Sequence, residues 1–158
     1  MHNLKPEKKR ISRYICVQII YAYELSSADN KKNYDSIFTK HFYTDLENSY
    51  GQLSKAQLDY SKMLYLESVK NRDFIDKLIQ ERLKTWDISR LAIIDRIILR
   101  MSASEMFFID EVPPKVSIAE GVEIAKVFST KDSSSFVNGI LDAIYNEVYI
   151  KDNKVSKV

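Results

Sequence analysis

Residues 112–142, VPPKVSIAEGVEIAKVFSTKDSSSFVNGILD, are the stretch that decides the fold class. The pattern predicts a proline turn, a helix, a polar loop over residues 129–135, and a second helix that opens on Phe136. The stretch holds no cysteine or histidine, and no base lies near its serines in the sequence. It therefore predicts a binding surface rather than a catalytic centre.

Helix start signals accompany these segments. Ser117 to Glu120 has the spacing of a capping box, which would begin the first of the two helices. Asp132 or Ser133 can cap the second helix, and Asp73 can cap an earlier one. We expect each of these residues to mark a helix N-terminus.

The rest of the chain predicts an all-α fold of about seven helices. Three glycines and three prolines are very few for a sandwich or barrel, which needs many turn residues. A break is expected at residues 26–30. The five helices before the proline turn are expected at about 7–25, 34–48, 55–71, 74–84 and 88–109, and the seventh helix is expected to end at about Tyr149.

The helix expected over 88–109 is the most apolar one. Its apolar side chains recur at helical spacing, so this helix should be packed on several sides at the centre of the fold. Asp95 and Glu105 interrupt it. A general acid or base is one interpretation, but a structural role is favoured because no nucleophile accompanies them. Asp95 could instead face outward toward a partner.

Composition suits one globular domain over residues 1–158. Hydrophobic residues make up 45% and charged residues 29% of the chain. No apolar run is long enough for a membrane span or a secretory signal. The single cysteine, Cys16, suits a reducing compartment, so we expect a cytoplasmic protein.

Positive charge is concentrated at the N-terminus. Residues 1–13 carry five basic side chains against Glu7, while the whole chain has a net charge of +2. Such a segment can bind phosphates, or it can be a solvated terminus. A basic arm over about 1–8 and a frayed tail over about 151–158 are expected to be flexible.

Aromatic side chains accompany these charges on the first helix. Tyr14 and Tyr21 share a side with Arg10 and Arg13, an arrangement that suits single-stranded nucleic acid. Tyr14 is expected to pack in the bundle, whereas for Tyr21 packing and RNA stacking are equally favoured. Phe136 could stack on bases beside the polar loop, but a core position is favoured.

Motifs of enzymes and metal sites are absent from the sequence. There is no phosphate-binding glycine loop, Cys-x-x-Cys or nucleophile elbow. His2 and His41 have no second ligand at metal spacing. We expect no catalytic residue, no metal and no cofactor.

Three segments resemble the bacterial transcription antitermination protein NusB family. They are KKRISRYICVQIIYAYELS at 8–26, WDISRLAIIDRIILRMSASEM at 86–106 and PPKVSIAEGVEIAKVFSTKDSSSFVNGILDAI at 113–144. The resemblance implies two packed helical bundles. It also implies binding of boxA-type single-stranded RNA together with the ribosomal protein NusE, in a transcription elongation complex with RNA polymerase on ribosomal RNA operons.

The resemblance also implies roles for single residues. Asp95 matches an acidic position near the NusE contact. RNA contacts are implied for the basic motif, the helix-one tyrosine, two residues of the polar loop and the aromatic that follows it; the residues are Lys9, Arg10, Arg13, Tyr21, Asp132, Ser133 and Phe136. The alternative is a helical protein-interaction scaffold, or a homodimer that hides the basic face and binds no specific RNA.

Overall fold

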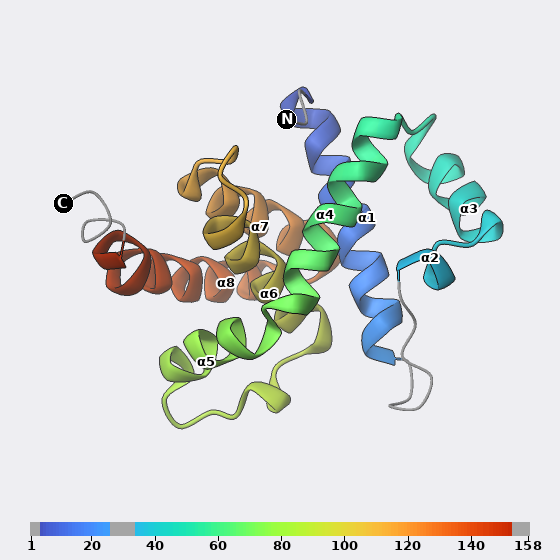
Figure 1. Cartoon of the computed structure of the whole chain (residues 1–158). Helices are drawn as coiled ribbons and strands as arrows, with labels where there is room; N and C mark the ends of the chain where they lie inside the picture. The colour runs from blue at the N-terminus through green and yellow to red at the C-terminus, as the bar shows by residue number, and fades with distance from the viewer. Residues whose placement is uncertain (1–3, 26–33, 153–158) are drawn as a thin grey trace. The chain divides into compact units, whose positions relative to one another are not determined.

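The computed structural model describes residues 4–25 and 34–152, and all regular structure in these ranges is helical. The predicted all-α class is confirmed, with eight α-helices in the described ranges where about seven were expected (Figure 1). None of these helices is long and apolar enough to cross a membrane. The break expected at residues 26–30 lies outside the described residues, as does His2.

The chain divides into two compact units, Met1–Leu66 and Glu67–Val158. The helices of the first unit are α1 (Pro6–Leu25), α2 (Tyr34–Ile37), α3 (Lys40–Tyr50) and the larger part of α4 (Lys55–Lys70). Those of the second are α5 (Arg72–Leu83), a 3-10 turn (Ile88–Arg90), α6 (Ile93–Phe108), α7 (Pro114–Phe128), α8 (Lys131–Ile144) and a π-helical turn (Tyr145–Tyr149).

The first unit has a core of aliphatic and aromatic side chains. Ile15 and Ile19 of α1 and Tyr60 and Leu64 of α4 are all fully buried. The helix α1 begins at Pro6, so residues 6–8 of the expected basic arm are helical. Proline suits this first position, where its missing N–H has no intrahelical partner to lose.

The helix expected over 34–48 is two helices. Thr39 has an extended backbone, with φ −78° and ψ 164°, and its hydroxyl accepts a hydrogen bond from the Phe42 N–H. A threonine that caps a helix in this way ends the preceding one, so α2 stops at Ile37 and α3 starts at Lys40.

The second unit is built around α6, as its apolar pattern predicted. Ile97, Ile98 and Leu99 are fully buried, and burial continues to Met106. The expected start at residue 88 was wrong. Asp87 instead caps the 3-10 turn, and the backbone is extended at Leu91 and Ala92 before α6 begins.

Three predicted caps were also wrong. The helix α7 begins at Pro114, and Ser117 lies inside it with 1% of its surface exposed. The cap of α8 is Thr130, whose hydroxyl accepts from the Ser133 N–H, so most of the predicted polar loop is the first turn of this helix. The residue before α5 is Asn71 rather than Asp73.

Candidate functional site

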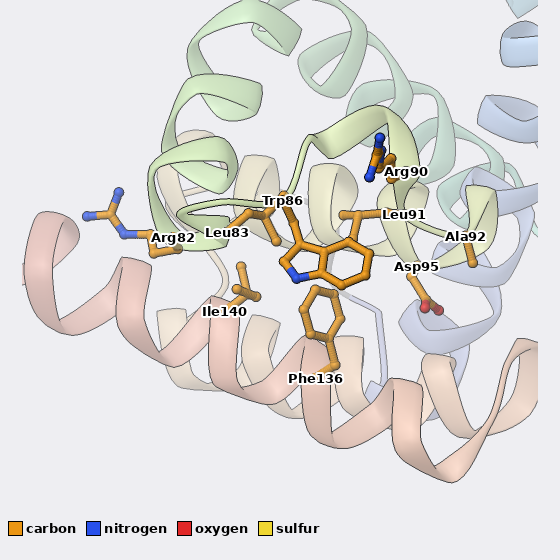
Figure 2. A pocket seen from close by; sticks show the side chains of 9 residues that line it. All are labelled: Arg82, Leu83, Trp86, Arg90, Leu91, Ala92, Asp95, Phe136 and Ile140. Carbon is orange, nitrogen blue, oxygen red and sulfur yellow. The ribbon is translucent and has the colours of Figure 1, made fainter.

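A pocket of about 450 Å³ opens on the second unit between α5, α8 and the segment that joins α5 to α6. Figure 2 shows its lining, which combines apolar and aromatic side chains with two arginines and one carboxylate. We call it the Trp86 pocket, and its lining residues are Arg82, Leu83, Trp86, Arg90, Leu91, Ala92, Asp95, Phe136 and Ile140.

Two aromatic rings face this pocket. Trp86 is the only tryptophan of the chain, and 61% of its surface is exposed. The ring of Phe136 is half-buried and points toward the indole (Figure 2). The core position favoured for Phe136 is therefore replaced by a place in a pocket wall, where one side of the ring is accessible. Flat accessible rings of this kind can stack on a planar ligand.

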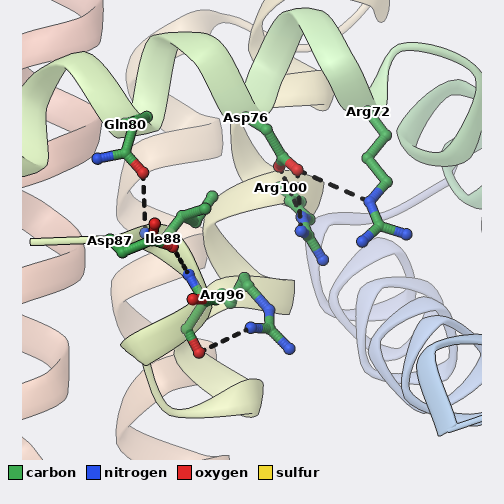
Figure 3. A network of polar contacts seen from close by, with 8 residues as sticks. Arg72, Asp76, Gln80, Asp87, Ile88, Arg96 and Arg100 are labelled. Carbon is green, nitrogen blue, oxygen red and sulfur yellow. Dashed lines mark hydrogen bonds and ion pairs between the residues drawn. The ribbon is translucent and has the colours of Figure 1, made fainter.

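The segment that carries Trp86 is held by one side chain of α5. The Gln80 amide donates from Nε2 to the Trp86 carbonyl over 2.7 Å and accepts at Oε1 from the Ile88 N–H over 2.9 Å. Figure 3 shows the second of these bonds. Both ends of the amide are used, so Gln80 holds the residues before and at the start of the 3-10 turn, and these residues form one wall of the pocket.

A buried ion pair fixes α5 on α6. The Arg100 guanidinium is 4% exposed and donates to both carboxylate oxygens of Asp76, over 2.7 and 2.9 Å (Figure 3). Two parallel bonds of this kind define the relative orientation of the two helices. Gln80 therefore projects from a helix that this ion pair ties to α6.

The rim of the pocket carries both signs of charge. Arg82 forms ion pairs with Glu147 at 3.0 Å and with Glu81 at 3.1 Å, while Arg90 is exposed. The pKa of Asp87 is lowered by hydrogen bonds that Ser89 donates, with a further contribution from the charge of Arg90.

Asp95 does not face outward, which was the alternative to the favoured structural role. Its side chain is 8% exposed, and its two carboxylate oxygens accept from the hydroxyls of Ser129 and Ser133, each over 2.9 Å. Two donors from the start of α8 satisfy the carboxylate, which explains why it turns inward. The structural role favoured over an acid or base is consistent with this geometry. Asp132 is exposed and Ser133 is half-buried on the same turn.

The basic residues of α1 lie in the first unit. Lys9 and Arg10 are half-buried, whereas Arg13 is only 2% exposed. The ring of Tyr60 lies beneath two of these cations, with its centroid 5.1 Å from Lys9 Nζ and 6.0 Å from Arg13 Cζ. The charges of Lys9 and Arg13 therefore lie near the same aromatic ring but differ in their exposure to solvent.

The two tyrosines of α1 differ as well. Tyr14 is half-buried with its ring centroid 5.9 Å from that of Tyr50, in keeping with the packing role expected for it. Tyr21 is 37% exposed, so more than its hydroxyl reaches the surface. Tyr21 is thus the one of the pair that is open to a ligand.

Sequence reasoning named only two of the nine residues that line the pocket, Asp95 and Phe136. Arg82 lies on α5, and Trp86 and Arg90 lie in the segment over 86–106, in which no residue before Asp95 was singled out. Gln80 of α5 supports Trp86. The available signal was Trp86 itself, since a lone tryptophan between two expected helices is an unusual residue to leave at a surface.

The described ranges contain no cluster of three metal-ligating side chains. His41 lies 3.5 Å from Asp45 on the surface of α3, where its imidazole is 89% exposed. Cys16 is buried and forms no disulfide within the described residues. The side chains that line the Trp86 pocket can stack on a ligand, form hydrogen bonds with it and pair with its charges.

Comparison with known proteins gives one consistent result. The NusB family model matches residues 10–146. A transcription antitermination protein NusB of Chloroherpeton thalassium is 39% identical over 143 residues, which are 90% of this chain and 64% of that protein. This chain thus spans slightly less than two thirds of that relative. The corresponding protein of Syntrophus aciditrophicus is 31% identical over 147 residues, 93% of this chain and 85% of that protein.

The fold also matches a solved structure. A crystal structure of the antitermination factors NusB and NusE in complex with double-stranded RNA contains a chain that superposes with a TM-score of 0.73 at 22% identity, over 90% of this chain and 99% of that one. At this identity the likeness concerns the fold. The family model and the two relatives carry the assignment: this chain belongs to the NusB family.

Proposed function

We propose that this chain is a transcription antitermination factor that binds boxA-type single-stranded RNA jointly with the ribosomal protein NusE. It would act in the cytoplasm as a non-enzymatic adaptor of the elongating RNA polymerase, notably on ribosomal RNA operons. The names of its relatives support antitermination. The complex of similar fold, which contains NusE and double-stranded RNA, supports NusE and RNA as partner classes.

The observation that carries this proposal is the Trp86 pocket. Sequence-specific RNA recognition usually targets unstacked bases, which stack on aromatic rings or arginine planes. Trp86 and Phe136 face a space of about 450 Å³ with Arg82 and Arg90 at its edge. We infer that a base enters this pocket and that Arg90, which is exposed, meets the backbone beside it.

A second set of RNA contacts is proposed on the first unit. Lys9 and Arg10 would meet phosphates, and Tyr21 would stack on a base. Arg13 is almost fully buried, so we assign it support of this surface through Tyr60 rather than a phosphate contact. On the second unit, Asp132 lies exposed on the first turn of α8 and would meet a base edge.

The proposal is tested by titrating boxA RNA and a scrambled RNA into the chain at two salt concentrations, with and without NusE. Because few cations are involved, binding by the chain alone should be modest and should weaken with salt, with a slope of about −0.7 per phosphate neutralised on a single strand. NusE should raise the affinity for boxA RNA more than that for the scrambled RNA.

Equal affinity for both RNAs under all four conditions would rule out specific RNA recognition. A scaffold that binds only protein predicts this result, together with a dimer whose mass in light scattering does not respond to RNA. The two hypotheses thus give opposite outcomes in the same samples.

A further inference from the structure

Four polar side chains form a closed set of hydrogen bonds where α6 meets the start of α8. Ser129 and Ser133 each donate to a different oxygen of Asp95, over 2.9 Å. Thr130 donates to the Ser133 hydroxyl over 3.1 Å and accepts from the Ser133 N–H over 3.1 Å. The Ser129 and Ser133 hydroxyl oxygens also lie 2.9 Å from each other, so the two serines contact each other as well as the carboxylate. We call this set the Asp95 latch.

The latch satisfies a carboxylate that is 8% exposed. The two serine donors and the favourable field of the first turn of α6 offset the cost of removing this charge from water. These hydrogen bonds also fix the orientation of the first turn of α8 relative to α6, because both carboxylate oxygens of Asp95 accept a bond at once.

The position of the latch connects it to the pocket. Ser133, Phe136 and Ile140 recur at helical spacing, so they lie on one side of α8. Asp95, Phe136 and Ile140 all line the Trp86 pocket. Holding Ser133 against α6 therefore sets the distance between Phe136 and the opposite wall, which carries Trp86 (Figure 2).

We propose that Asp95 is a positioning residue for RNA binding, which holds the first turn of α8 so that Phe136 faces Trp86 before RNA arrives. This inference rests on the proposed RNA-binding function and adds to it. In this role Asp95 acts through its hydrogen bonds with Ser129 and Ser133, which orient the first turn of α8. Without the latch, only part of the molecules would present the binding geometry, and the apparent affinity would fall by that fraction.

The test is a double-mutant cycle between Asp95→Ala and the pair Ser129→Ala/Ser133→Ala, with the affinity for boxA RNA as the readout. Each change should weaken binding by about tenfold if one molecule in ten keeps the geometry. Their combination should weaken binding no further, because both remove the same latch. Asp95→Asn should recover most of the affinity, since its amide can accept from one serine and donate to the other.

Ser135→Ala is the matched control, because Ser135 is exposed on the same turn and outside the latch. Affinity for boxA RNA should stay at the wild-type level in this variant. Thermal unfolding of each variant shows whether a loss of affinity merely follows a loss of stability. The serine variants also keep the test valid if Asp95→Ala does not fold.

A second readout, amide hydrogen exchange of residues 133–137 in the free chain, does not depend on RNA. If the latch exists, amide exchange at these residues should be faster in Asp95→Ala and in Ser129→Ala/Ser133→Ala than in the wild type. The variant that combines all three substitutions should show no further increase. Three results would each overturn the proposal. The losses of RNA affinity could be additive in the cycle, or amide exchange could be unchanged in the variants. Asp95→Ala could also lose NusE binding while it keeps its affinity for RNA. If the wild-type chain does not distinguish boxA from scrambled RNA, the proposed function fails, and the exchange data still decide whether the latch exists.

Discussion

Phe136 and Val137 are neighbours on α8 with opposite roles. Phe136 is half-buried in the wall of the Trp86 pocket, whereas Val137 is fully buried. We expect Phe136→Ala to lose about 1–3 kcal/mol of binding to boxA RNA, the typical value of one stacked base, with little change in thermal stability.

Val137→Ala is the control for that prediction. It should lower the free energy of unfolding by up to about 1.5–3 kcal/mol, because it removes buried apolar surface, and it should leave RNA affinity nearly unchanged. Fluorescence titration and denaturant unfolding of both variants decide the matter. A Phe136→Ala variant that unfolds more easily yet binds RNA normally would make Phe136 a packing residue.

Single residues also show which structural features a sequence pattern can predict and which it cannot. The burial of Ile97, Ile98 and Met101 was predictable, because apolar periodicity directly reflects which helix face is covered. The inward turn of Asp95 was not, since its donors come from residues 34 and 38 positions later in the chain. Sequence analysis identified Phe136 but missed Trp86. Trp86 was missed because the pocket that joins the two residues forms only when the chain folds.

At the scale of elements, helix boundaries were the weakest predictions. The capping box at Ser117 fits the local pattern, yet Pro114 begins α7 one turn earlier, because proline is well suited to a first helical position. Likewise Thr130 rather than Asp132 caps α8, so a segment read as a loop is a helix. Several adjacent hydroxyl and acidic residues could each cap a helix, and tertiary contacts decide among them.

The close approach of α7 to its neighbours leads to a second prediction. A Cβ on Gly121 would lie 2.5 Å from Ser102 Oγ and 3.1 Å from Leu141 Cδ1, closer than side chains can approach without a shift. Gly121→Ala should therefore destabilise the fold by about 1–3 kcal/mol, the usual cost of an overpacked core.

Gly139 provides the matched comparison on α8. A Cβ there meets nothing within 4 Å, and the position is exposed inside the helix. Gly139→Ala should raise the free energy of unfolding by up to about 1 kcal/mol, because alanine favours the helix. Equal effects of the two substitutions in urea unfolding would contradict the close packing at Gly121.

At the scale of the whole molecule, each unit carries its own set of proposed RNA contacts. The first unit offers Lys9, Arg10 and Tyr21, and the second offers the Trp86 pocket with Asp132. The two units were expected as two helical bundles from the family resemblance, and the all-α class followed from composition and periodicity alone. The family assignment supplies the partners that neither charge nor packing could name.

Joint binding of RNA and NusE is the central claim. If both ligands favour the same state of the complex, linkage requires that boxA RNA tighten NusE binding by the same factor by which NusE tightens RNA binding. The most direct measurement is the Kd of NusE for the wild-type chain by calorimetry, with and without saturating boxA RNA. We predict at least a fivefold tightening, the lower end of typical coupling between sites, with none from scrambled RNA. An affinity for NusE that is the same with and without boxA RNA would contradict the claim.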